Sequence, residues 1–188
     1  SLKSFAVASV TPVIIDPETT YITLTTTFKY DSSLTTKDVS TLQTNVLDAV
    51  TGYNTNNLLD FTGMFRYSEV LKTIDDADTS ILSNITKVKM YKFITPTLNS
   101  ALKYTISYNN GFYNPHSEHN KTAGGVVSST GFKISNDDST NEHFLDDDGA
   151  GNLRVYYLSG TTRIYTSSDF GTVDYTNGEI VLTLSLIH

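Results

Sequence analysis

The stretch GTVDYTNGEIVL, residues 171–182, decides the fold expected for the second half of this chain. The stretch begins with a β-forming run, continues with Asn177 and Gly178, and ends with a second β-forming run. Asn-Gly between two such runs is the strongest short-range indication of a β-hairpin, because both residues tolerate a positive φ. The stretch therefore predicts two antiparallel strands joined by a turn at Asn177-Gly178.

Further short β-forming runs surround this hairpin. Turn residues such as Ser159-Gly160 separate them, and a long polar segment, residues 109–125, is expected to be a loop. This spacing predicts an antiparallel sandwich or meander. The expected strands are residues 102–108, 126–128, 131–135, 153–158, 163–166, 171–175 and 179–186.

The first half of the chain contains alternating β-type runs. Residues 21–30 (YITLTTTFKY) place apolar side chains at every second position, which is typical of a strand with one buried face. Residues 85–94 (ITKVKMYKFI) follow the same period and are closed by Pro96. A shorter apolar run occupies residues 10–15. These runs predict a small sheet.

Between those runs the apolar spacing changes to three and four, which predicts two amphipathic helices. The first is expected over residues 34–53, with Thr35 as N-cap and Asp38 reaching back to it. The second is expected to begin after Ser68 as N-cap. The apolar stripes are Val39, Leu42, Val46, Ala49, Val50 and Tyr53 in the first helix and Val70, Leu71, Ile74 and Ala77 in the second.

Two helices over one face of a small sheet make an α+β layer. No helical pattern follows residue 98, and the composition changes near Pro96. We therefore expect an α+β domain at residues 1–97 and an all-β domain at residues 98–188.

The composition narrows the classes of function. The chain has 188 residues, of which 38% are hydrophobic and 11% aromatic, so it can bury a core. Its net charge of −7 does not suit a protein that neutralises nucleic-acid phosphates or docks on an anionic membrane. It has no cysteine, which excludes disulfides and thiolate metal sites. No apolar run approaches the roughly 20 residues that span a bilayer. Ser1 in place of Met and the ending LSLIH lead us to expect a piece of a longer polypeptide.

Three side chains in segment 109–125 are the first candidates for a metal site. His116, Glu118 and His119 supply two imidazoles and a carboxylate within a short stretch. Zinc takes three or four such ligands in fixed geometry, and the stretch is an expected loop without the helical HExxH pattern. We therefore expect a polar surface loop and no cofactor, with metal binding as the alternative.

The run Asp146–Asp148, followed by Gly149, has the outline of a calcium loop. Such a loop needs a bidentate Glu at its twelfth position, which is Tyr157 here. A hairpin turn is therefore the favoured interpretation, and Asp137-Asp138 is expected to be a similar exposed turn.

The remaining candidates also favour structural roles. Asp75, Asp76 and Asp78 are expected on a solvent-facing helix end rather than as an acid–base pair. Arg66 is expected to clamp a loop or pair with a neighbour, and Gly124-Gly125 to be a flexible loop element. Because no Ser lies on a GxSxG elbow, the sequence does not indicate an enzyme.

Both halves resemble parts of phage tail proteins. The first half resembles the baseplate J-like domain, through VTPVII (10–15), the run 21–30, the helical segment 35–53 and TGMFRYSEVLKTIDDADTSI (62–81). The second half, with FLDDDGAGNLRVYYL (144–158) and GTVDYTNGEIVL (171–182), resembles the C-terminal region of the large baseplate wedge protein of contractile-tailed myoviruses.

This resemblance implies a non-enzymatic structural protein of the virion tail baseplate, made in the host cytoplasm and without a cofactor. It implies contacts with itself, as a homodimer within a ring, and with other baseplate proteins, but none with nucleic acid or membrane. Aromatic residues are enriched in interface cores, so we expect Phe112, Tyr113 and one of Tyr156 and Tyr157 at subunit contacts. The alternatives are a glycan- or receptor-binding tail module and a hydrolase of unrecognised type.

Overall fold

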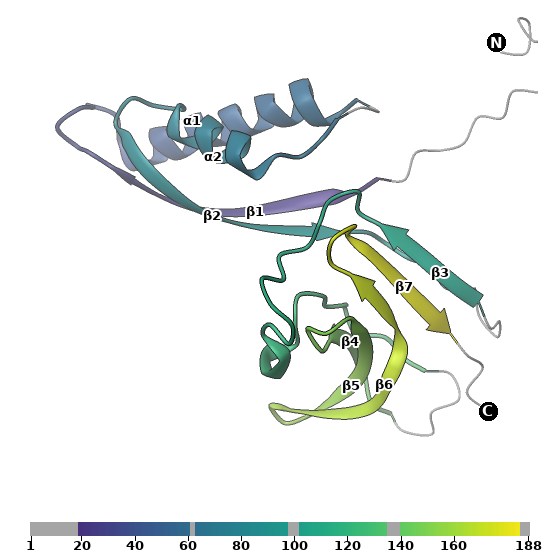
Figure 1. Ribbon diagram of the computed structural model, residues 1–188. Coiled ribbons are helices and arrows are strands. Elements are labelled where there is room, and N and C mark those ends of the chain that lie inside the picture. The colour runs from purple at the N-terminus through teal and green to yellow at the C-terminus, as the bar shows by residue number, and fades with distance from the viewer. Residues whose placement is uncertain (1–18, 61–62, 98–101, 135–139, 185–188) are drawn as a thin grey trace, which may run out of the picture. The chain divides into compact units, whose positions relative to one another are not determined.

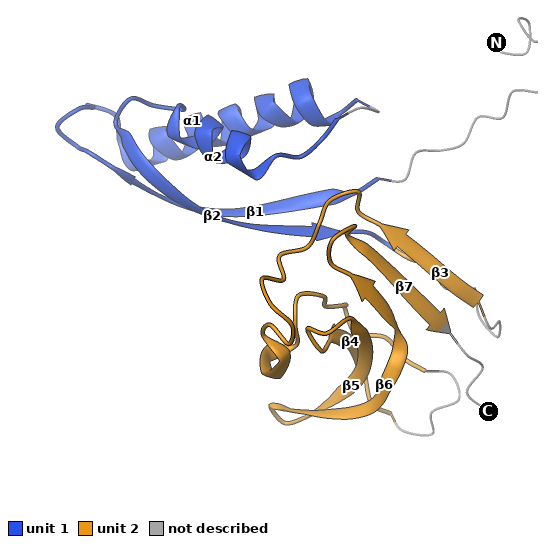
Figure 2. Cartoon of the chain, in the orientation of Figure 1, with its two compact units in different colours: residues 1–93 blue, residues 94–188 orange. Residues whose placement is uncertain are grey.

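The computed structural model describes residues 19–60, 63–97, 102–134 and 140–184. The chain forms two compact units, residues 1–93 and 94–188 (Figure 2). The predicted α+β fold is confirmed: two helices accompany a two-stranded sheet, and the second unit is built on a five-stranded antiparallel sheet (Figure 1). The expected strand at residues 10–15 and the expected turn at Asp137-Asp138 lie outside the described residues.

The sheet of the first unit pairs β1 (Tyr21–Tyr30) with β2 (Ile81–Tyr91) in antiparallel sense. β1 has the bounds that its alternation predicts, and every second side chain is partly buried. The prediction for β2 is wrong at its start, because the strand begins at Ile81 rather than at residue 85. Pairing of Ile81 with Tyr30 extends the ladder to the end of β1, so the partner strand overrides the weak β-propensity of residues 83–84.

The two helices of this unit are α1 (Val39–Tyr53) and α2 (Tyr67–Asp75), and a π-helical segment, η2 (Asn54–Leu58), follows α1. The expected start of the first helix at residue 34 with Thr35 as N-cap is wrong. Asp38 caps α1 instead, because its carboxylate accepts the Thr41 amide hydrogen bond at 2.8 Å. Ser68 is also not a cap, since α2 begins one residue before it. No helix of the described residues has both the length and the apolar character needed to cross a bilayer.

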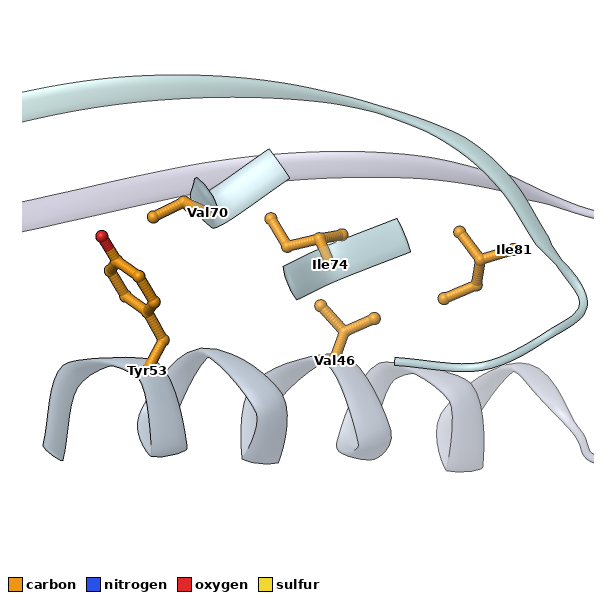
Figure 3. Close-up of a cluster of buried hydrophobic side chains, with 5 residues drawn as sticks. All are labelled: Val46, Tyr53, Val70, Ile74 and Ile81. Atoms are coloured by element: carbon orange, nitrogen blue, oxygen red, sulfur yellow. The ribbon is translucent and has the colours of Figure 1, made fainter. Parts of the chain in front are cut away.

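Both helices cover one face of the β1–β2 sheet and enclose a core with it. Figure 3 shows side chains of α1 and α2 meeting between α1 and the strands, together with Ile81 at the start of β2. Partly buried side chains of β1 pack against this cluster. The buried members are Val46, Tyr53, Val70, Ile74 and Ile81.

The second unit is one antiparallel sheet with strand order β3-β7-β6-β5-β4 (Figure 1). Four strands follow one another in a meander, and β3 is added at the β7 edge, so the described strands form the meander rather than the sandwich. The core on this sheet consists of Ile106, Leu153, Val173, Ile180 and Leu182. The strands are β3 (Leu102–Ser107), β4 (His143–Asp147), β5 (Asn152–Ser159), β6 (Thr162–Asp174) and β7 (Glu179–Leu184), and a 3-10 turn, η3 (Lys121–Ala123), lies in the long segment.

The hairpin at residues 171–182 is confirmed, with a longer turn than expected. Residues 175–178 connect β6 to β7, and only Gly178 of the Asn-Gly pair has a positive φ, +64°. Asp174 shapes the turn, because its Oδ1 accepts the amide hydrogen bonds of Thr176 and Asn177 at 3.0 and 2.9 Å.

Four of the other strand predictions are corrected. The expected strands 163–166 and 171–175 are one bent strand, because β6 has extra residues between its pairings at Ser167 and Gly171. The expected strands 126–128 and 131–135 are reduced, within the described residues, to isolated bridges at Ser128 and Phe132.

Candidate functional site

Three consecutive aspartates organise the second unit. Asp147 binds residues 126–127, which follow the long polar segment, Asp146 joins neighbouring strands, and Asp148 shapes the turn between β4 and β5. The expectation that Asp146 and Asp147 belong to a turn is wrong, because both lie in β4 with exposed fractions of 1% and 0%. A buried carboxylate is tolerated in a strand when hydrogen bonds satisfy its oxygens. Both aspartates meet this condition through donors from several parts of the unit.

Asp147 anchors the chain directly after the long polar segment. Its Oδ1 accepts hydrogen bonds from the backbone amides of Val126 and Val127, both at 2.6 Å. Its Oδ2 accepts from the Gly149 amide at 3.1 Å and from the Tyr175 hydroxyl at 2.6 Å. Burial is the larger cause and the hydrogen bond to Asp147 the smaller cause that raise the pKa of Tyr175 above its ordinary value. The phenol therefore stays protonated and donates to Asp147.

Asp146 joins two cations from neighbouring strands. Its Oδ1 accepts from Arg154 Nε at 2.8 Å, and its Oδ2 accepts from Arg163 Nη1 at 2.8 Å and from the Tyr165 hydroxyl at 2.9 Å. The guanidinium groups also cover rings, with Arg154 at 4.4 Å from the Tyr165 centroid and Arg163 at 4.8 Å from that of Tyr156. Burial, and then the Asp146 hydrogen bond, raises the pKa of Tyr165. The cluster neutralises a buried charge and ties β4, β5 and β6 together.

Asp148 alone occupies the predicted turn. Its Oδ1 accepts from the amides of Ala150 and Asn152 at 2.8 and 3.0 Å, and its Oδ2 accepts from Asn152 Nδ2 at 2.7 Å. Burial acts to raise the pKa of Asp148, but these hydrogen bonds lower it below its ordinary value. Every carboxylate oxygen of the three aspartates therefore accepts a protein donor, which is the opposite of a calcium loop.

The structure brings together two of the three expected metal ligands. His119 Nδ1 lies 3.3 Å from His116 Nε2, and Tyr113 meets the His119 ring edge-on with 5.7 Å between centroids. Glu118 instead binds Lys121, with 2.6 Å between Oε1 and Nζ. No group of three or more potential metal-binding side chains occurs within the described ranges.

The Gly124-Gly125 pair is fitted closely to the aspartates. Gly125 has φ +63°, and a Cβ atom there would lie 2.2 Å from Asp147 Oδ2. A Cβ atom at Gly124 would lie 2.0 Å from Arg163 Nη1. The expectation of a flexible loop element is therefore wrong, because only glycine lets the backbone approach the carboxylates this closely.

The four aromatic interface candidates have different environments. Phe112 is partly buried against the second core, with its ring 5.3 Å from that of Tyr108. Tyr113 is 75% exposed, whereas Tyr156 is 8% exposed under Arg163. Tyr157 is partly buried.

The candidates of the first unit take part in local contacts. The expectation that Asp78 faces solvent is wrong, because its side chain is only 6% exposed. It accepts hydrogen bonds from Lys37 Nζ at 2.6 Å and from the Ser80 amide at 3.0 Å. The Lys37 and Ser80 hydrogen bonds hold the pKa of Asp78 well below its usual range. Three further contacts are exposed or partly buried pairs: Asp76 with Lys72, Arg66 with Glu69, and Asp75 with Asn84.

The first unit also matches a known family. Residues 18–93 match the family model of baseplate structural protein gp6, C-terminal domain III. This chain is a structural component of a phage baseplate. No curated protein matches it.

In this baseplate protein, sequence reasoning missed the partners of the buried aspartates. Arg154, Arg163, Tyr165 and Tyr175 lie in or beside predicted strands, yet their side chains complete the carboxylate network. One available indication was the run HFLDD, in which Phe and Leu continue the β-forming composition up to the aspartates.

Proposed function

We propose that this chain works as a non-enzymatic subunit of a baseplate wedge, assembling by protein–protein contacts with other baseplate proteins and with a second copy of itself in a ring. The observation that carries the proposal is the match of residues 18–93 to the baseplate structural family. The resemblance of its segments to J-like and wedge proteins supports the finer assignment. We place it in the virion tail after synthesis in the host cytoplasm, with no nucleic-acid or membrane partner.

The polar groups of the second unit support a structural role. A carboxylate that reacts directly with a substrate needs an oxygen open to it, whereas Asp146 and Asp147 have their oxygens filled by donors of their own chain. Such a network stiffens a surface loop, and a stiff loop loses little entropy when it binds. Tyr113, exposed on that segment, is the aromatic contact that we propose first, with Tyr157 second.

Mass spectrometry of purified tails tests the proposed location, because a structural subunit must be present in them. Sedimentation of the full chain over a concentration series tests self-association. We expect Tyr113→Ala to weaken association by about tenfold or more, as loss of an interface aromatic does, and the exposed Leu59→Ala to leave it unchanged. Absence of the chain from tails would refute the proposal, and a monomer at every concentration would refute its self-association.

A further inference from the structure

The β1–β2 sheet buries only one of its faces. Asn84 of β2 points to α2, where its Nδ2 donates to the Leu71 carbonyl at 3.0 Å and to Asp75 Oδ1 at 2.8 Å. Side chains alternate along a strand, so the odd-numbered residues of β2 from Ser83 onward, beyond the register shift next to Ile81, face away from the helices, and those paired with them on β1 do the same. This uncovered surface, the open face, consists of Tyr21, Thr23, Thr25, Thr27, Lys29, Ser83, Ile85, Lys87, Lys89 and Tyr91.

The open face is positively charged in an acidic protein. It carries Lys29, Lys87 and Lys89 and no acidic residue, while the whole chain has a net charge of −7. The residues directly across the ladder from these lysines are Ser83, Thr25 and Thr23, so no cross-strand carboxylate balances them.

One end of the open face is an aromatic cluster. Tyr21 and Tyr91 stack at 5.2 Å between centroids, and Phe93 meets them edge-on at 5.5 and 5.6 Å. Phe93 is 78% exposed, and Ile85 on the same face is 74% exposed. β1 and β2 are both edge strands of a two-stranded sheet, and lysines on edge strands commonly serve to prevent pairing with other chains. Exposed aromatic and aliphatic groups do not serve that purpose and are typical of a binding site.

We propose that the open face docks an acidic surface of a neighbouring baseplate protein, with the Tyr21–Tyr91–Phe93 cluster as its apolar anchor and the three lysines facing carboxylates. This inference rests on the proposed function. Charge selects the occupant: a second copy using the same face would set lysine against lysine, which is unfavourable in a two-fold contact.

The size of the face indicates a weak contact. The ten residues of β1, at about 3.3 Å each, give the face a length of about 33 Å. Two strands side by side are about 10 Å wide. The resulting area of about 330 Å² is below the roughly 800 Å² that each partner contributes to a stable interface. The contact would therefore depend on salt and on the many simultaneous contacts of an assembly.

The test uses the isotope-labelled full chain and a decapeptide that alternates glutamate with valine, followed by nuclear magnetic resonance. We expect amide shifts confined to β1, β2 and Phe93 at about millimolar peptide, fading when salt rises from about 50 to about 500 mM. Lys87→Glu with Lys89→Glu should weaken binding at least tenfold, and Tyr91→Ala should weaken it with the charges intact. Lys103→Glu, an exposed strand lysine of the second unit, is the matched control, and unchanged helical circular dichroism shows that each variant folds.

Several outcomes would overturn this inference. They are no shift on the open face, an equal response to a lysine–valine peptide, or tighter binding of duplex DNA than of the acidic peptide. Self-association in the absence of peptide that the Lys87→Glu and Lys89→Glu changes abolish would make a second copy the occupant instead. A chain that is present in tails but fails the peptide test would lose this inference and keep the proposed function.

Discussion

Replacing Asp147 by Asn tests whether one carboxylate holds the long polar segment in place. The amide oxygen of Asn can still accept from Val126 and Val127, but its Nδ2 then faces the Gly149 N–H, and two donors repel. Two charge-assisted bonds become neutral, at about 1 kcal/mol each, and a buried N–H without an acceptor costs about 1–3 kcal/mol. We therefore expect Asp147→Asn to destabilise the second unit by about 3–5 kcal/mol.

Urea unfolding followed by tyrosine fluorescence measures this loss, because the chain has 12 Tyr and no Trp. With a slope of about 1–3 kcal/mol/M, the midpoint of the second unit should fall by about 1–5 M. Hydrogen exchange should accelerate at the Val126 and Val127 amides, and Asp169→Asn on exposed β6 should change neither measurement. A loss under about 1 kcal/mol with unchanged exchange at both amides would refute the reasoning.

Three further predictions concern the first unit. Asp38→Ala should lower its Tm by about 4–8 °C through loss of the α1 cap, whereas Thr35→Ala should leave it nearly unchanged, and the reverse order would contradict the cap assignment. Ile74→Ala, at a fully buried site, should cost about 2–5 kcal/mol in urea unfolding, against less than about 0.5 kcal/mol for the exposed Leu47→Ala. Since the folded pKa of Asp78 is lowered, its stabilisation is complete above the unfolded pKa of about 3.9 and is lost as pH falls towards the folded pKa. Asp78→Asn should therefore lower Tm at neutral pH and flatten the fall of Tm below about pH 4, and a parallel pH curve would show that the carboxylate does not contribute.

Strands with one buried face were predictable from the sequence. β1 has the expected bounds because its Ile, Leu and Phe positions alternate with Thr, and the helices bury that one face. β4 was not predictable in the same way, because Asp is depleted in strands and two of its five residues are Asp. Distant partners, among them Arg163 and Tyr175, make these aspartates compatible with a strand, and local sequence does not contain that information.

The candidate site was predictable in composition but not in arrangement. The polar segment was expected, and His116 and His119 do lie together, whereas a subunit contact at the exposed Tyr113 stays a prediction. The role of Gly124-Gly125 depends on carboxylates about twenty positions further along the chain, so no local pattern could distinguish a close fit from a flexible link. Helix starts were wrong for a related reason, because several neighbouring polar residues can act as caps and folding selects one of them.

The pairing of β3 with β7 sets an order of events during synthesis. The register places Leu102 opposite Leu184. After β3 has left the ribosome, this ladder therefore cannot form until β7 has also been synthesised. At about 5–20 residues/s the delay is about 4–16 s, during which the edge of β3 is open to strands of other nascent chains. The β1–β2 ladder of the first unit also joins distant residues, such as Tyr21 and Tyr91, but it is complete once β2 has been synthesised, so the first unit can fold ahead of the second. Crowded translation of many copies would therefore put β3 at greatest risk of exchange between polypeptides.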